Sequence, residues 1–126
     1  MIQTESILVI TDNSGGKNAK CVHVLPGFKK RYAYAGDTIV SVVKNLKSKK
    51  KVISKVKKGD LIYLVIIRTK FKKSTKDGSF LNFNMNAGAL VNKQSRPLAS
   101  RILGPVMKTL KSGKCMKVAS LSSGFV

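Results

Sequence analysis

The chain has 126 residues, of which 25 are Lys or Arg and five are Asp or Glu, so its formal net charge is +20 at pH 7. So many positive charges repel one another in a compact domain. Nucleic acid best supplies the missing negative charge, because each phosphate that the protein neutralises releases condensed counterions. With 43% apolar residues the chain is too hydrophobic for a disordered basic tail, and its longest apolar run, residues 61–67, is too short to cross a membrane.

Short runs rich in β-branched residues, separated by turn-forming residues, predict strands along a single domain. In chain order the runs are residues 6–10, 20–25, 38–43 and 61–68, followed by two weaker candidates at 80–83 and 89–91. Gly36-Asp37 and Gly59-Asp60 stand directly before two of the runs, where glycine permits a tight turn and aspartate can bond the backbone beyond it. This spacing predicts a mainly β protein, built as a small closed or nearly closed barrel.

The fourth run leads into a basic segment, residues 68–76, that ends at the hairpin-turn signal Asp77-Gly78-Ser79 before Phe80 resumes the apolar pattern. This pattern predicts a basic β-ribbon that projects from the barrel.

A different pattern near the C-terminus, residues 103–111, predicts a short helix. Pro105 suits the first helical position, Val106 and Leu110 are four residues apart, and Gly113 can end the helix.

Motifs typical of catalysis or metal binding are missing from the sequence. Asp12, Asp37, Asp60 and Asp77 each lie within three residues of a glycine, so turn formation accounts for them. His23 is two residues from Cys21, which predicts that both face the same side of a strand, but one further cysteine, Cys115, completes only a poor zinc signature. We therefore expect no enzymatic activity, no cofactor, no metal and no disulfide, with both cysteines buried and reduced.

Basic residues concentrate at three places, residues 29–32, 44–58 and 68–76. The middle cluster is either a solvated loop or a binding surface, and seven lysines between residues 47 and 58 favour a bound anion, because without one they add to the repulsion. Tyr32 and Tyr34, beside the first cluster, could stack on bases or equally well pack on the barrel.

A series of short motifs then runs in order along nearly the whole chain. They are residues 1–3, 11–15, 31–33, 36–37, 56–60, 66–70, 77–79, 86–87, 101–102, 104–106 and 117–121. Together they resemble the universal large-ribosomal-subunit protein fourteen family, in its bacterial and organellar type. The resemblance implies a five-stranded barrel over about residues 1–95 with a protruding ribbon, and a small helical C-terminal part over about residues 96–126.

The resemblance also implies a structural constituent of the large ribosomal subunit that binds large-subunit rRNA. Residues expected to contact that RNA are Lys17, Lys29, Lys30, Arg31, Tyr32, Arg68, Lys70, Lys72, Lys73, Lys76 and Arg96. In the family, the barrel side near residues 44–52 approaches small-subunit rRNA at an intersubunit bridge. Residues expected to face that bridge are Lys44, Lys47, Lys49, Lys50 and Lys51.

Protein partners are implied as well. They are neighbouring large-subunit ribosomal proteins and a ribosome-silencing factor, which would dock at Ser100, Arg101 and Ser120. We expect no membrane partner. The alternative function is a stand-alone barrel that binds single-stranded nucleic acid, which should expose more aromatic residues than Tyr32 and Tyr34.

The composition, rich in Lys, Asn, Ser and Ile, resembles proteins encoded in AT-rich mitochondrial genomes. A mitochondrial ribosome is therefore the favoured location, with the cytoplasm of an AT-rich bacterium as the alternative. Since the chain starts at the family's own first residue, a mitochondrial member would be expected to be made inside the organelle.

Overall fold

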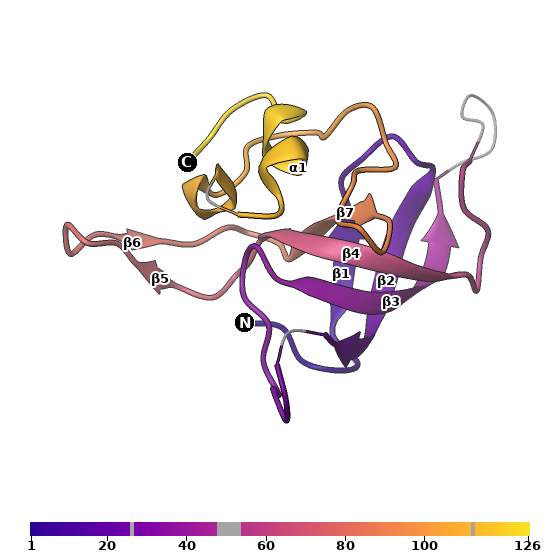
Figure 1. Cartoon of the computed structure of the whole chain (residues 1–126), viewed down its shortest axis with the longest axis horizontal. Coiled ribbons are helices and arrows are strands. Elements are labelled where there is room, and N and C mark those ends of the chain that lie inside the picture. Colours follow the sequence, from indigo (N-terminus) through magenta and orange to yellow (C-terminus); the bar gives the residue numbers. More distant parts are fainter. Residues whose placement is uncertain (26, 48–53, 112) are drawn as a thin grey trace.

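Five strands of the protein form a closed barrel in the order β1-β2-β3-β4-β7 (Figure 1). The computed structural model describes residues 1–25, 27–47, 54–111 and 113–126. The barrel strands are β1 (Ile7–Ile10), β2 (Gly16–Val24), β3 (Thr38–Leu46), β4 (Leu61–Arg68) and β7 (Ala87–Val91). Neighbouring strands are antiparallel except β1 and β7, whose parallel pairing of Val9 with Ala87 closes the barrel. The predicted fold class is confirmed.

The apolar run of β4 is continuous because this strand is buried on both faces. Leu64 and Ile66 point into the barrel core, while Val65 and Ile67 alternate with them and belong to a second core on the outside of the barrel. The C-terminal part of the chain covers this outer face, and its Met107, Leu110 and Val118 fill the second core. A strand with one exposed face would instead show alternating polar residues.

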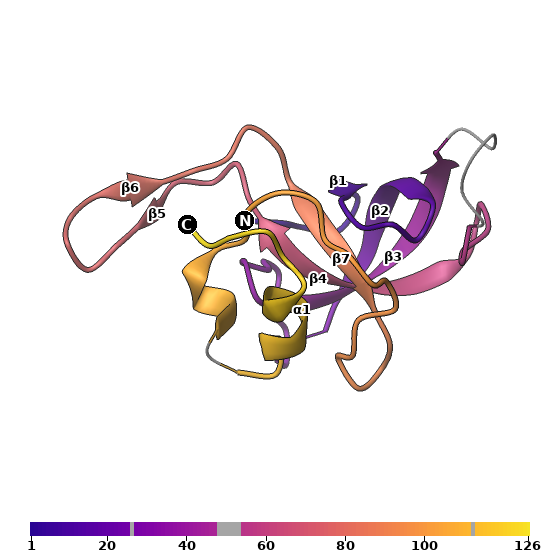
Figure 2. The same ribbon diagram turned by 90° about the horizontal axis from the view of Figure 1, so that it is seen from above.

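The predicted ribbon is present and projects away from the barrel (Figure 2). It consists of β5 (Lys73–Ser74) and β6 (Phe80–Leu81), and the backbone N–H of Thr75 donates to the carbonyl of Ser79 at 2.9 Å to close the turn. Since Phe80 and Leu81 pair within the ribbon, the weak strand candidate at residues 80–83 belongs to the ribbon, not to the barrel.

The predicted helix over residues 103–111 is wrong in its bounds. A 3₁₀ turn, η1, covers Lys108–Lys111, and the short α-helix α1 covers Met116–Ser120. Val106 is extended instead, because its N–H donates to the carbonyl of Gly124 at 3.0 Å and its carbonyl accepts from the N–H of Val126 at 2.9 Å. Among the described residues, no helix has the length and apolar character needed to cross a membrane.

A second expectation that the structure overturns is that Cys21 and His23 face the same side of β2. The register of β2 against β3 shifts between these two residues, and a shift of this kind interrupts the alternation of side chains. Cys21 is consequently buried in the barrel core, whereas His23 is exposed.

Candidate nucleic-acid interface

The ribbon and the place where β3 ends and β4 begins lie at opposite ends of the long axis of the molecule (Figure 1). The sequence has basic residues in both regions. At one end, the basic ribbon projects beyond the end of β4. At the other end lie the last residues of β3 and the first of β4. Lys44 is near the end of β3, and Lys57 and Lys58 stand just before β4. Because β3 and β4 are antiparallel neighbours, the fold itself separates the second and third basic clusters of the sequence.

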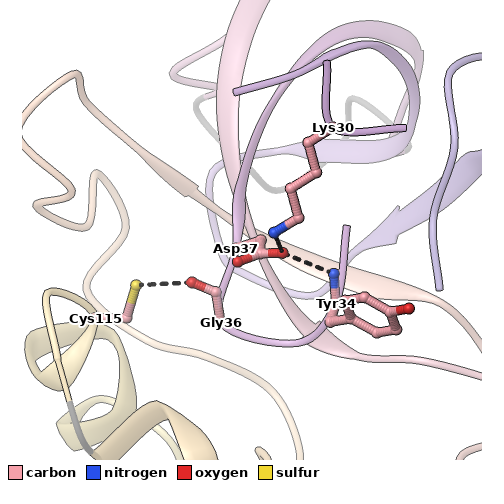
Figure 3. A network of polar contacts seen from close by, with 5 residues as sticks. All are labelled: Lys30, Tyr34, Gly36, Asp37 and Cys115. Atoms are coloured by element: carbon pink, nitrogen blue, oxygen red, sulfur yellow. Dashed lines mark hydrogen bonds and ion pairs between the residues drawn. The ribbon is translucent and has the colours of Figure 1, made fainter. Parts of the chain in front are cut away.

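The connection between β2 and β3 is here called the basic loop, and it is described at residues 25 and 27–37. Hydrogen bonds hold the part of this loop that leads back to β3. The Asp37 carboxylate accepts from Lys30 Nζ at 2.8 Å and from the Tyr34 N–H at 2.9 Å (Figure 3). Ala33 exchanges two backbone hydrogen bonds of 2.8 Å with Ile2. Lys29, Lys30 and Arg31 are all exposed, but Lys30 is paired with the Asp37 carboxylate.

The basic loop also meets the base of the ribbon. The rings of Tyr34 and Phe71 pack edge to face with centroids 6.4 Å apart. Between them and the C-terminal part lies a cavity of about 380 Å³, lined by residues that include Lys72, Lys73 and Phe80. Tyr34 thus contacts Phe71 but is still 46% exposed, and Tyr32 is 38% exposed.

Within the ribbon, the lysines face solvent. Lys70, Lys72 and Lys76 are exposed and Lys73 is half-buried. The N–H of Lys70 donates to the Asn86 side chain at 2.9 Å, which fixes where the ribbon leaves the barrel.

Arg68 differs from the other predicted RNA ligands because it is buried, with 9% of its surface exposed. Its guanidinium donates to the carbonyl of Leu103, and burial lowers the pKa of the Arg68 guanidinium. Gly104, at φ +84°, lies so close that an added Cβ would sit 2.8 Å from Arg68 Nη2. This contact joins the end of β4 to the C-terminal part and leaves little of Arg68 available to RNA.

At the opposite end of the barrel, Lys44, Lys57 and Lys58 are exposed. Two further lysines bond to backbone carbonyls of the protein. Lys47 Nζ donates to the carbonyl of Asp12 at 2.7 Å, and Lys55 Nζ donates to the carbonyl of Leu98 at 2.8 Å. The predicted bridge residues Lys49, Lys50 and Lys51 lie outside the described residues.

Asp12 has a larger role than the turn formation predicted for it. It is fully buried, and its carboxylate accepts from the N–H of Ser14 at 3.0 Å and from the N–H of Leu90 on β7 at 2.8 Å. The Ser14 hydroxyl donates to the same carboxylate. A turn motif indicates the Ser14 bonds, but no local pattern predicts the bond to Leu90, 78 residues away.

The remaining predicted site residues lie elsewhere on the surface. Lys17 and Arg96 are exposed, on β2 and in the loop after β7. Ser100 and Arg101 immediately precede Ile102, which forms a parallel bridge with Ser122, so the fold brings them close to the Ser120 segment. The hydroxyl of Ser100 accepts from the Asn13 amide at 2.9 Å, and that of Ser120 donates to the carbonyl of Lys117 at 2.8 Å.

Phe28, in the basic loop, was not predicted as a site residue, yet its side chain is 93% exposed. The signal available in the sequence was its position between Gly27 and three consecutive cations, Lys29, Lys30 and Arg31.

The carboxylates of the protein leave most of its cations unpaired. Within the described ranges there are two ion pairs, Lys20 with Glu5 and Lys30 with Asp37. In the same ranges no three His, Cys, Asp or Glu side chains gather in a way that could hold a metal ion. The surface is therefore suited to neutralising an extended polyanion, and its positive charge is spread over both ends of the molecule.

The comparison with known proteins agrees with this chemistry. A family model described as ribosomal protein L14p/L23e matches residues 1–126, the whole chain.

Proposed function

The chain belongs to the ribosomal protein L14p/L23e family and is thus a structural, non-enzymatic protein of the large ribosomal subunit, and we propose that it binds large-subunit rRNA through the ribbon and the basic loop. The observation that carries this proposal is the distribution of unpaired cations. Lys29, Arg31, Lys70, Lys72 and Lys76 are exposed on the basic loop and the ribbon, which meet where Tyr34 contacts Phe71. Several exposed cations without a carboxylate partner support binding to the phosphates of a folded RNA.

Through this surface the protein recognises mainly the shape and the phosphate backbone of the RNA. Lysine dominates the ribbon, and an ammonium group contacts phosphate as a point charge but lacks the planar fork with which arginine reads base edges. Lys73 and Tyr32 contribute to the same surface. Lys17 on β2 and Arg96 in the loop after β7 are proposed as further RNA contacts outside this surface. Arg68 contributes indirectly, because its bond to the Leu103 carbonyl holds the end of β4.

The opposite end of the barrel, with Lys44, Lys57 and Lys58 exposed, is proposed to face small-subunit rRNA at an intersubunit bridge. Lys47 supports this end by its bond to the Asp12 carbonyl. Separation of the two basic ends along the long axis favours this arrangement, because one protein can then contact two RNA surfaces at once.

The Ser100, Arg101 and Ser120 surface is proposed to receive a protein, either a neighbouring ribosomal protein or a ribosome-silencing factor. Its support is that the Ile102–Ser122 bridge brings residues from two distant segments to one place. The proposed location is the mitochondrial ribosome, on the composition of the chain, with a bacterial ribosome as the alternative.

A stand-alone single-strand-binding barrel is the second candidate function. In the described chain, Phe28, Phe71 and Phe80 are exposed together with the two tyrosines, so the number of exposed aromatics does not argue against it. The family match over the whole chain favours the ribosomal function.

Sedimentation of a lysate through a sucrose gradient tests the proposal. The tagged protein should migrate with large subunits and with whole ribosomes, and it should stay bound to the rRNA when the peak fractions are irradiated to crosslink RNA and extracted. Migration at the top of the gradient, or with other ribonucleoproteins, would support the second candidate.

A further inference from the structure

Phe28 presents an aromatic ring to solvent more completely than any other large apolar side chain in the described part of the chain. The exposed fraction of its side chain is 93%, compared with 69% for Phe80 in the ribbon. Single exposed apolar residues are common on protein surfaces, so exposure alone indicates nothing. The surroundings of this ring make it different.

The loop that carries Phe28 is bonded to the rest of the protein where it returns to β3. The Ile2–Ala33 bridge holds it, as do two backbone bonds to Ile66 of β4, from the Gly36 N–H at 2.8 Å and to the Asp37 carbonyl at 3.0 Å. Within the loop, Lys30 and the Tyr34 N–H both donate to the Asp37 carboxylate (Figure 3). Near the ring the backbone turns sharply, with φ of +92° at Gly27 and +54° at Lys29. The left-handed conformation is uncommon for lysine, and such residues occur preferentially at ligand-binding positions. The ring is thus placed by an anchored loop.

One cation lies over the ring, and a second is close to it in the sequence. Lys29 Nζ lies over the Phe28 ring, 5.4 Å from its centroid, and Arg31 is exposed two residues further along the loop. Among the described residues of this loop, the carboxylate that pairs with a cation is that of Asp37, and Lys30 and the Tyr34 N–H already share it. An apolar pocket of a protein partner would have to desolvate these cations in order to bury the ring. An unpaired nucleotide meets both needs, since its base stacks on the ring and its flanking phosphates accept the cations.

We propose that Phe28 stacks on an unpaired base of large-subunit rRNA while Lys29 and Arg31 contact the adjacent phosphates. This inference rests on the proposed function, and it adds a single-base contact to an interface that otherwise recognises shape and backbone.

Three variants of the full chain separate stacking from other roles, with binding to transcribed large-subunit rRNA as the measurement. Stacking on an aromatic residue is worth roughly 1–3 kcal/mol per base, so Phe28→Ala should weaken binding by roughly 5- to 150-fold. Phe28→Tyr keeps a π-face and should stay within about twofold of the wild type. Phe28→Leu keeps apolar surface but lacks the ring, and should resemble Phe28→Ala. Because the ring is exposed, none of these changes should disturb folding.

The salt dependence supplies a matched control. Phe28→Ala removes no charge and should leave the slope of log K against log salt unchanged, whereas Lys29→Gln should reduce that slope by about one. Wild-type affinity in Phe28→Leu, or unchanged affinity in Phe28→Ala, would overturn the stacking role.

Crosslinking within assembled subunits distinguishes this inference from the proposed function. A photoreactive benzoylphenylalanine at position 28 should crosslink to an unpaired nucleotide of the large-subunit rRNA. Crosslinks to protein alone, or none, in subunits that still contain the variant would refute the base contact and leave the ribosomal function intact. Failure of the wild-type chain to enter large subunits would refute both.

Discussion

At the scale of single residues, Asp12 links the turn after β1 to β7 and to the end of β3. Its carboxylate accepts from the Leu90 and Ser14 N–H groups, and its carbonyl accepts from Lys47. A buried donor that loses its acceptor costs about 1–3 kcal/mol.

Asp12→Ala should therefore lower the free energy of unfolding by roughly 2–6 kcal/mol, since two buried N–H groups lose their acceptor. Urea denaturation of the purified protein measures the change. Asp77→Ala is the matched control because it removes the same charge from the exposed ribbon turn, and it should cost less than about 0.5 kcal/mol. Equal destabilisation by the two variants would contradict the role of Asp12.

The two thiols give a second prediction at this scale. Burial, and secondarily the charge of Glu5, raises the pKa of Cys21; burial and the charge of Asp37 raise that of Cys115. Both thiols should react with Ellman's reagent at pH 8 at least about tenfold more slowly in the native protein than in urea, because the thiolate is the nucleophile.

The same pKa shifts fix the sign of a pH effect. A thiol in the unfolded chain has a pKa of about 8.5, and the native pKa values of both cysteines lie above it. As the pH rises past about 8.5, the unfolded chain therefore loses protons before the native chain does, and the free energy of unfolding decreases. A Cys21→Ala, Cys115→Ala variant should show a smaller decline between pH 8 and 10. An equal decline would show that the thiols do not contribute.

Residue-scale expectations were incomplete for Asp12 and wrong for Cys21 and His23, because distant contacts decide the outcome in both cases. The turn sequence around Asp12 is local, but its partner Leu90 is not. Likewise, the alternation of side chains along a strand predicted that Cys21 and His23 lie on one side. The shift in register against β3 puts them on different sides.

At the scale of elements, the strands and the ribbon could be predicted because their signals are local. β4 is a continuous apolar run, and the ribbon turn carries its own Asp-Gly signal. The C-terminal helix could not be placed, since Val106 takes its hydrogen-bond partners from residues 124 and 126. Tertiary pairing there outweighs a weak local preference for helix.

The two basic ends should have separable functions. Changing Lys70, Lys72 and Lys76 of the ribbon to Gln removes three exposed cations without touching the core. At roughly 0.5–1 kcal/mol for each surface contact, binding to large-subunit rRNA should weaken by roughly 10- to 150-fold. Gradient profiles should show less of this variant in large subunits.

The control removes the same charge at the other end, by changing Lys44, Lys57 and Lys58 to Gln. That variant should enter large subunits normally but reduce the fraction of joined ribosomes. Identical phenotypes for the two triple variants would show a general effect of charge and would refute a division between an anchoring end and a bridge end.

At the scale of the whole molecule, a formal charge of +20 accompanies a folded barrel of the L14p/L23e family. Composition predicted a polyanionic partner, and the order of motifs predicted the family. The surroundings of single cations were harder to predict, because Arg68 and Lys30 look like free cations in the sequence while the fold binds both to its own oxygen atoms.

Binding should depend steeply on salt if phosphates hold the protein. With roughly 6–10 phosphates neutralised, affinity for large-subunit rRNA should fall by about 10³–10⁵ between 50 and 200 mM salt. Filter binding over that range measures the slope, and a nearly flat response would mean that the charge excess does not act through phosphate contacts.

The most direct measurement is a cryo-EM map of the native ribosome that contains this chain. The central claim predicts the ribbon and the basic loop against large-subunit rRNA, with ammonium groups of Lys70, Lys72 and Lys76 within about 3 Å of phosphate oxygens. It also predicts the Lys44, Lys57 and Lys58 end at the intersubunit face. A map in which the ribbon extends into solvent, or in which the two ends exchange places, would contradict the account.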